Sequence, residues 1–176
     1  MKKFLPILVL AVLVFTAACT LFKKDIDVPQ VFSIEVNQSA ADPLQFTTTK
    51  EVTTLDADVE KYKEEIDEFR ISKVTCKVAQ FSGSNAPVVS GNLLFAAAGT
   101  SNFKTLGAVE NLDLKALNLS GDEVNVPIAD EQVKQELISL IKAGTNIILK
   151  LDAETTENPV VATLDFTVYA TISVEL

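Results

Sequence analysis

The C-terminal segment, residues 160–176, alternates between apolar and polar side chains without a break. One set is wholly apolar: Val160, Ala162, Leu164, Phe166, Val168, Ala170, Ile172, Val174 and Leu176. The intervening positions hold mainly Thr, Ser, Tyr and acidic residues. Because successive side chains of a strand point to opposite faces, this pattern predicts one long strand with one buried face, which bends or passes between two sheets. Such a strand needs partners, so the chain is expected to be mainly β.

Shorter period-two patterns predict the partner strands at residues 26–36, 44–49, 70–81, 88–98, 112–119 and 145–152. Pro29 indicates an edge position or a bend, because proline cannot donate to a strand ladder. Gly91 indicates a bulge. The turn at residues 155–159 predicts a hairpin between the segment 145–152 and the C-terminal strand.

Two segments show helical spacing of apolar residues instead. Residues 56–69 form one, with Asp56 as N-cap, and residues 130–142 form the other. Both helices are short and apolar on one side only, so each is expected to cap an open end or edge. The predicted fold is therefore an antiparallel β-sandwich with two short capping helices, after an N-terminal signal peptide.

The N-terminus has the layout of a secretory signal peptide. Lys2 and Lys3 precede an apolar run over residues 4–18, which ends in Thr16, Ala17 and Ala18. The run is shorter than the about 20 residues that span a membrane.

The residues Thr16-Ala17-Ala18-Cys19 resemble the lipobox of bacterial lipoproteins. This resemblance implies that lipid is attached to the thiol of Cys19 and that the leader is cut before it. Thr16 departs from the pattern, which usually has an aliphatic residue there. Thr20 follows the cysteine, and the resemblance then favours the outer membrane. Two or three acyl chains would hold the protein firmly, whereas a single chain gives only marginal binding.

The resulting organisation is a signal peptide at residues 1–18, a lipidated tether at 19–27 and a single β-sandwich domain at 28–176. Removing the leader with Lys2 and Lys3 changes the net charge from −9 to −11. A surface this acidic disfavours nucleic acid and anionic lipid as partners. The membrane is therefore expected to be reached through the lipid on Cys19 alone.

The amino-acid composition limits the kinds of catalytic and metal-binding site that the chain can form. The chain has no histidine, which excludes Ser-His-Asp and Cys-His catalysis and imidazole metal sites. The serines beside Gly83 have no nucleophile motif, and no phosphate-binding glycine loop is present. We therefore expect no catalytic residues, no metal and no cofactor.

Several other features have an ordinary structural explanation. The acids of segment 56–69 are expected to be a solvated helix face, Asp122-Glu123 a turn rather than a calcium ligand pair, and Cys76 a buried small hydrophobe. The sequons at Asn37 and Asn118 are taken as chance. The polar face of the last strand could meet sugar or protein, or could simply be an exposed strand face; its residues are Thr163, Thr167, Tyr169 and Thr171.

The whole chain resembles small bacterial lipoproteins that carry β-sandwich domains. The expected function is a non-enzymatic binding or structural domain, anchored in the cell envelope, with a protein or glycan partner. The alternative is a periplasmic carrier that holds an apolar ligand or lipid between its two sheets. A structural part of an envelope machine is the third hypothesis.

Overall fold

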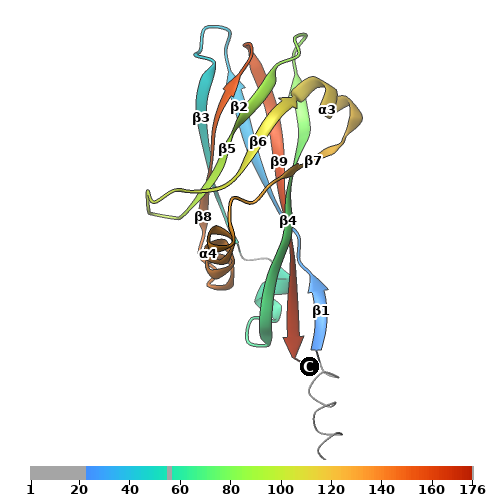
Figure 1. Cartoon of the computed structure of the whole chain (residues 1–176), viewed down its shortest axis with the longest axis vertical. Helices are drawn as coiled ribbons and strands as arrows, with labels where there is room; N and C mark the ends of the chain where they lie inside the picture. The colour runs from blue at the N-terminus through green and yellow to red at the C-terminus, as the bar shows by residue number, and fades with distance from the viewer. Residues whose placement is uncertain (1–22, 55–56, 176) are drawn as a thin grey trace, which may run out of the picture.

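The computed structural model describes residues 23–54 and 57–175, apart from the side chain of Asp58. Most of these residues lie in strands (Figure 1). The described elements, in chain order, are β1 (Lys23–Asp27), β2 (Gln30–Gln38), β3 (Gln45–Val52), α2 (Ala57–Lys61), β4 (Ile66–Ser82), β5 (Val88–Ala97), β6 (Lys104–Asp113), α3 (Leu114–Ser120), β7 (Glu123–Val126), α4 (Glu131–Lys142), β8 (Ile147–Thr155) and β9 (Val160–Glu175).

The strands form two antiparallel sheets that face each other. In the first sheet β9 lies between β4 and the pair β1 and β2, and β7 pairs with the far side of β4. The second sheet has the order β3-β8-β5-β6. Strands β2, β9, β4 and β7 facing β3, β8, β5 and β6 have the order of an eight-stranded jelly roll, to which β1 adds a short edge segment. The predicted antiparallel β-sandwich is confirmed.

The long strand predicted at the C-terminus is β9, and it organises the first sheet. Its even-numbered residues from Val160 to Val174 are all buried, as the alternation predicts. One edge of β9 pairs with β1 and β2, and the other edge pairs with β4 over most of its length. The strand stays in one sheet throughout and does not pass between sheets.

The segment predicted as a single strand at residues 26–36 is divided at Pro29 into β1 and β2. Both strands lie on the same edge of β9, so the edge position that Pro29 indicated is confirmed, whereas the division into two strands was not predicted. The tether expected over residues 19–27 needs correction. Residues 23–27 are strand β1, and residues 19–22 lie outside the described residues.

The helix expected over residues 56–69 is largely wrong. Helix α2 ends at Lys61, and Ile66 begins strand β4. Phe69 pairs with Ile172 of β9 and is buried. Pairing with β9 therefore outweighs the helical spacing of the local sequence, because helix propensity is a weak preference that tertiary contacts override.

The strand expected over residues 112–119 is also wrong beyond Asp113. Helix α3 begins there because the Asp113 carboxylate accepts a hydrogen bond from the backbone N–H of Ala116 at 2.9 Å. It ends at Gly121, whose φ of 73° lies in the left-handed region.

The hairpin expected between the segment 145–152 and the last strand does not form. Strand β8 belongs to the second sheet and β9 to the first, so the turn between them crosses the sandwich. The predicted helix at residues 130–142 is confirmed as α4, whose N-cap Asp130 accepts from the N–H of Val133 at 2.8 Å. Both α3 and α4 contact β4 of the first sheet and β6 of the second, so each helix bridges the two sheets.

The edges of the two sheets meet at Gly107. This residue forms an isolated antiparallel bridge with Ile128, and the N–H of Ala129 donates to the carbonyl of Leu106 at 2.8 Å. A Cβ added at Gly107 would lie 2.4 Å from the main-chain oxygen of Pro127. The close approach of these two segments of the backbone therefore requires glycine at this position.

We expect Gly107→Ala to lower the free energy of unfolding by roughly 1–3 kcal/mol, because backbone rather than a flexible side chain must move. Urea denaturation measures this change. The exposed residue Asn92 on the neighbouring strand β5 provides the control, since Asn92→Ala should change stability by less than about 0.5 kcal/mol. Equal stability of the two variants would contradict the tight contact at this edge.

Candidate functional site

The predicted lipidation site, Cys19, and the cleavage residues Thr16, Ala17 and Ala18 lie outside the described residues. The described chain begins at Lys23 at the narrow end of the molecule, where β9 also ends (Figure 1). We call this end the base, and define it by Lys23, Asp67 and Glu175. Four residue steps separate Lys23 from Cys19, a distance of at most about 14 Å when extended. The base is therefore the end of the described domain to which the segment carrying Cys19 is joined.

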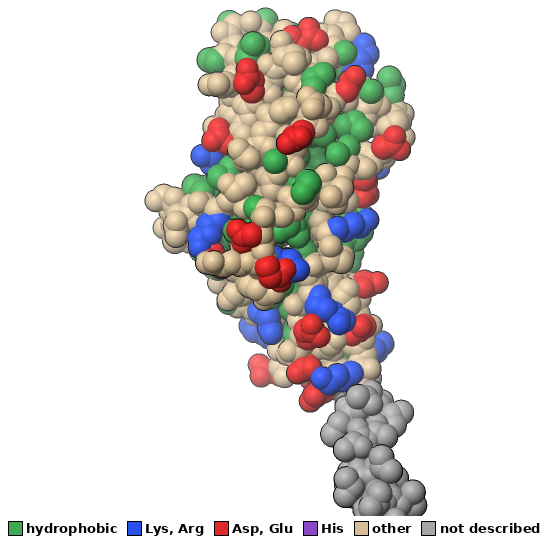
Figure 2. Space-filling model, viewed as in Figure 1, with side chains coloured by type: hydrophobic (Ala, Val, Ile, Leu, Met, Phe, Trp, Pro, Cys, Tyr) green, Lys and Arg blue, Asp and Glu red, His purple; other side chains and the backbone are tan. Residues whose placement is uncertain are grey.

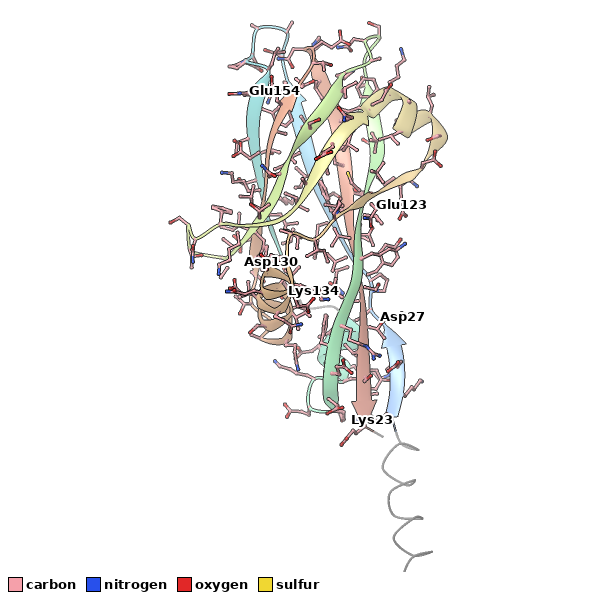
Figure 3. All side chains as sticks on the ribbon, in the orientation of Figure 1. Lys23, Asp27, Glu123, Asp130, Lys134 and Glu154 are labelled. Carbon is pink, nitrogen blue, oxygen red and sulfur yellow. The ribbon has the colours of Figure 1, made fainter. Side chains whose placement is uncertain are left out.

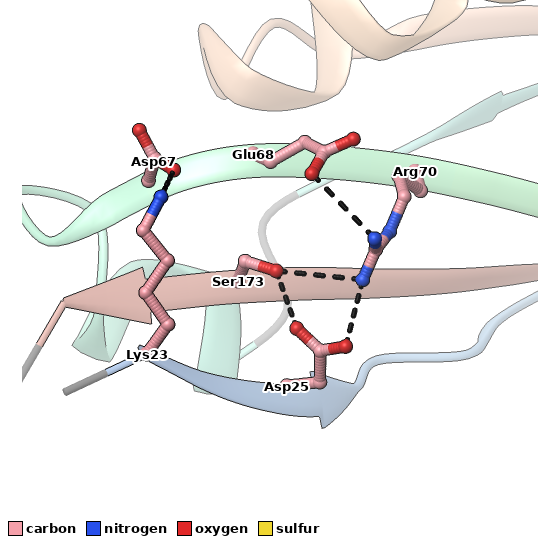
Figure 4. Close-up of polar contacts among 6 residues, drawn as sticks. All are labelled: Lys23, Asp25, Asp67, Glu68, Arg70 and Ser173. Carbon is pink, nitrogen blue, oxygen red and sulfur yellow. Dashed lines mark hydrogen bonds and ion pairs between the residues drawn. The ribbon is translucent and has the colours of Figure 1, made fainter. Parts of the chain in front are cut away.

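Ion pairs join β1 to the beginning of β4 at the base, and a hydrogen bond joins it to the end of β9 (Figure 4). Lys23 pairs with Asp67 of β4. Arg70, the only arginine of the chain, contacts Asp25 at 2.8 Å between Nη2 and Oδ2. Ser173 of β9 donates its hydroxyl hydrogen to the Asp25 carboxylate.

These contacts shift the pKa values of two charged residues of β1, Asp25 and Lys23. The Ser173 hydroxyl bond, together with Arg70, holds the pKa of Asp25 below its usual range. The hydrogen bond and charge of Asp67 raise the pKa of Lys23. Both shifts favour the charged forms that hold β1 in place.

The attachment of β1 nevertheless rests mainly on its backbone. Its side chains are exposed except for half-buried Ile26, and exposed ion pairs contribute little to stability. Five residue pairs with β9, from Lys23 with Glu175 to Asp27 with Thr171, supply the ladder. The ion pairs help to fix the register and the orientation of β1, which has no buried face to fix them.

We expect Asp25→Asn to speed amide hydrogen exchange in β1 at neutral pH. The folded pKa of Asp25 is lowered, so its contribution is present above the unfolded pKa and is lost as pH falls through the folded pKa. The difference between the variant and the wild type should therefore vanish at low pH. NMR-detected exchange of the β1 amides measures it.

Glu35→Gln, at an exposed position of β2, is the matched control and should leave β1 exchange unchanged. A difference between Asp25→Asn and the wild type that persists at low pH would show that charge on Asp25 is not what holds β1.

The outer face of the first sheet carries a second polar cluster, around Tyr169 of β9. Its hydroxyl donates to Glu123 of β7 at 3.0 Å, and Lys73 lies 4.2 Å from the centre of its ring. The nearby Thr75 hydroxyl and the hydrogen bond from Tyr169 lower the pKa of Glu123. The bond to Glu123 raises the pKa of Tyr169. The cluster thus holds a charged carboxylate, that of Glu123 (labelled in Figure 3), beside a neutral phenol on the outer face of the sheet.

The polar residues predicted on the last strand share this face. Thr163, Thr167, Tyr169 and Thr171 alternate with the buried residues of β9. The Thr171 hydroxyl donates to Asp27 of β1 at 3.0 Å. The sequence indicated this polar face but not the contact between Tyr169 and Glu123, because these two residues are 46 positions apart in the chain.

The remaining candidates are spread over the molecule. Glu123 of the Asp122-Glu123 pair bonds to Tyr169, and no group of three Asp, Glu, Cys or His side chains within the described part of the chain could hold a metal. Asn37, Ser82 and Asn118 line one open hollow of about 670 Å³ at the end opposite the base. Among the described helices none is long and apolar enough to cross a membrane.

Cys76 lies on the inner face of β4 and is 1% exposed, which confirms the prediction of a buried residue. Burial raises the pKa of its thiol to about 12. The thiolate needed for reaction is therefore scarce at neutral pH.

We expect Cys76 to react with Ellman's reagent only as fast as the domain unfolds. Adding denaturant should raise the labelling rate steeply, because it exposes and solvates the thiol. Cys76→Ser should remove the signal and identify the reacting residue. Rapid labelling of the native protein at residue 76 would contradict the buried position.

Comparison with known proteins adds little to this description. No protein-family model matches the chain, and no curated protein matches it. The structure of Desmodium yellow mottle tymovirus is similar with a TM-score of 0.35 and 10% identity, covering 87% of this chain and 84% of that one. The decameric BFDV capsid protein has a TM-score of 0.36 and 10% identity, covering 85% and 98%. TM-scores this low imply nothing about shared function, and the jelly-roll assignment rests on the strand order.

Proposed function

We propose that this chain is a lipoprotein of the bacterial cell envelope, anchored through lipid on Cys19, whose β-sandwich serves as a non-enzymatic binding or structural domain. The outer membrane is the proposed location. The observation that carries the proposal is the sequence Thr16-Ala17-Ala18-Cys19 after a charged and apolar leader.

The position of the base supports this proposal. Lys23 starts a strand at one extreme end of an elongated domain, and the rest of the sandwich extends away from it (Figure 1). A lipid on Cys19 would leave both outer sheet faces and the opposite end free for a partner. The base itself carries intermingled acidic and basic side chains (Figure 2), so charge alone gives it no strong attraction to anionic lipid.

The alternative proposal, a carrier of an apolar ligand or lipid between the sheets, has weaker support. Side chains from the inner faces of both sheets belong to one buried cluster, with Phe166 and Ile34 from the first sheet and Leu93 and Leu151 from the second. Close packing of this kind argues for a core rather than a pocket. We therefore favour a role for the outer surfaces.

We expect Cys19→Ser to leave an unprocessed precursor or to release the domain from membranes, because the serine hydroxyl cannot replace the thiol in lipid attachment. Membrane fractionation with metabolic palmitate labelling in a bacterial host measures both outcomes.

Cys76→Ser is the matched control, since this buried thiol has no part in anchoring, and it should remain labelled and membrane-bound. A Cys19→Ser protein that is processed and membrane-bound like the wild type would show the lipoprotein proposal to be wrong.

A further inference from the structure

The lower part of β4 has an unpaired edge. Strand β7 pairs only with the segment Val74–Lys77 of β4, so residues 68–73 have β9 on one side and no strand among the described residues on the other. No described backbone group outside the sheet ladder bonds to this segment. In an antiparallel strand, alternate residues direct their N–H and C=O groups away from the partner. This segment therefore presents free main-chain donors and acceptors.

Helix α4 faces this edge across a groove of about 720 Å³. Residues of β4, among them Arg70, form one wall, and the groove continues onto the neighbouring strands at Asp25 and Asp27 of β1 and Thr171 of β9. Glu131, Lys134 and Gln135 of α4 line the other wall together with Ile138, positions that share one face of a helix. Figure 3 shows Lys134 on the side of α4 toward β4.

The helix wall is held in place by its own contacts. Glu131 pairs with Lys134 at 2.7 Å and accepts from the Gln135 side chain at 2.8 Å. Ile138 is buried beneath them, which fixes the helix against the core. The pairing of β4 with β9 is irregular between Ile66 and Glu68, at one end of the groove, and between Ile71 and Lys73, within it, and these irregularities limit the regular part of β4 to a short stretch. Irregularities of this kind oppose long sheet-to-sheet pairing but leave room for a short strand.

We infer that this groove binds a short extended segment of a partner polypeptide, which adds a strand to the free edge of β4 and lies against α4. A strand edge beside a helix is a known way to recognise extended peptides: main-chain hydrogen bonds supply affinity and the helix face supplies specificity. The groups available for hydrogen bonding at this edge are main-chain N–H and C=O groups. Only another polypeptide backbone can pair with such groups along several successive residues.

The charged residues that line the groove determine which kind of peptide segment it favours. Its lining has four acids, Asp25, Asp27, Glu68 and Glu131, against the two bases Arg70 and Lys134. An excess of carboxylates favours a segment with lysine or arginine at alternate positions, because complementary charge favours encounter and correct register. This inference gives a partner class to the binding role proposed above.

Selection from a displayed random octapeptide library, on the full-length protein in detergent, tests the inference. We expect enriched peptides to carry basic residues at alternate positions. Binding of a selected peptide should slow amide exchange within residues 68–71 of β4. Methylation of its backbone nitrogens should abolish binding, because an added strand must donate those N–H groups.

Glu131→Lys should lower the affinity for the selected basic peptide by about tenfold or more, because it places a positive charge in the groove where the peptide's positive charges bind. Glu154→Lys makes the same charge change at an exposed position of β8 and should leave affinity unchanged. Amide exchange of both variants without peptide checks that each is folded.

Four results would overturn the inference: no enrichment, enrichment of acidic peptides, undiminished binding after backbone methylation, or equal effects of the two variants. Self-association that Glu131→Lys abolishes would identify a second copy of this chain as the occupant instead. None of these results depends on lipid, so they leave the outcome of the Cys19→Ser experiment unaffected.

Discussion

The structure depends on one buried face, that of β9. Its apolar residues pack across the sandwich, while both of its edges carry partners over much of their length. Burial of a whole strand face is the largest favourable contribution a single element here can make, since stabilisation grows with apolar area removed from water. The register of β1, β2 and β4 is fixed by this strand, because a slip of one residue would turn its Thr and Asp residues inward.

The length of β9 and β4 explains why the sandwich needs helices. These strands have 16 and 17 residues, whereas the strands of the second sheet have 8 to 10. The first sheet therefore extends beyond the second at the base, where Phe69 and Val174 would otherwise face water. Helices α2 and α4 lie against this extension (Figure 1), and they bury Val59 and Ile141 in the shared core. The capping helices are thus a consequence of unequal sheets.

Period-two patterning predicted most of the fold, because a strand with one buried face has an apolar side chain at every second position. It located β9 and β5, and it placed Cys76 inside the core. It failed at residues 66–69, where pairing with β9 overrides helical spacing, and at α3, where the Asp113 cap outweighs the strand alternation. The contacts of Arg70 with Asp25 and of Tyr169 with Glu123 were not predictable, because they depend on which distant strands become neighbours.

The attachment of β1 and the groove beside α4 involve the same pair of strands, and Asp25 and Asp27 of β1 also line the groove. At this end β9 and β4 lie side by side: β1 covers the free edge of β9, whereas the free edge of β4 borders the groove beside α4. Arg70 connects the two features, because it pairs with Asp25 of β1 and also lines the groove. A strand added to β4 would therefore meet the residue that helps to orient β1. Attachment of the chain and recognition of a peptide would then share one charged side chain, and both would take place at the end of the domain to which the segment carrying Cys19 is joined.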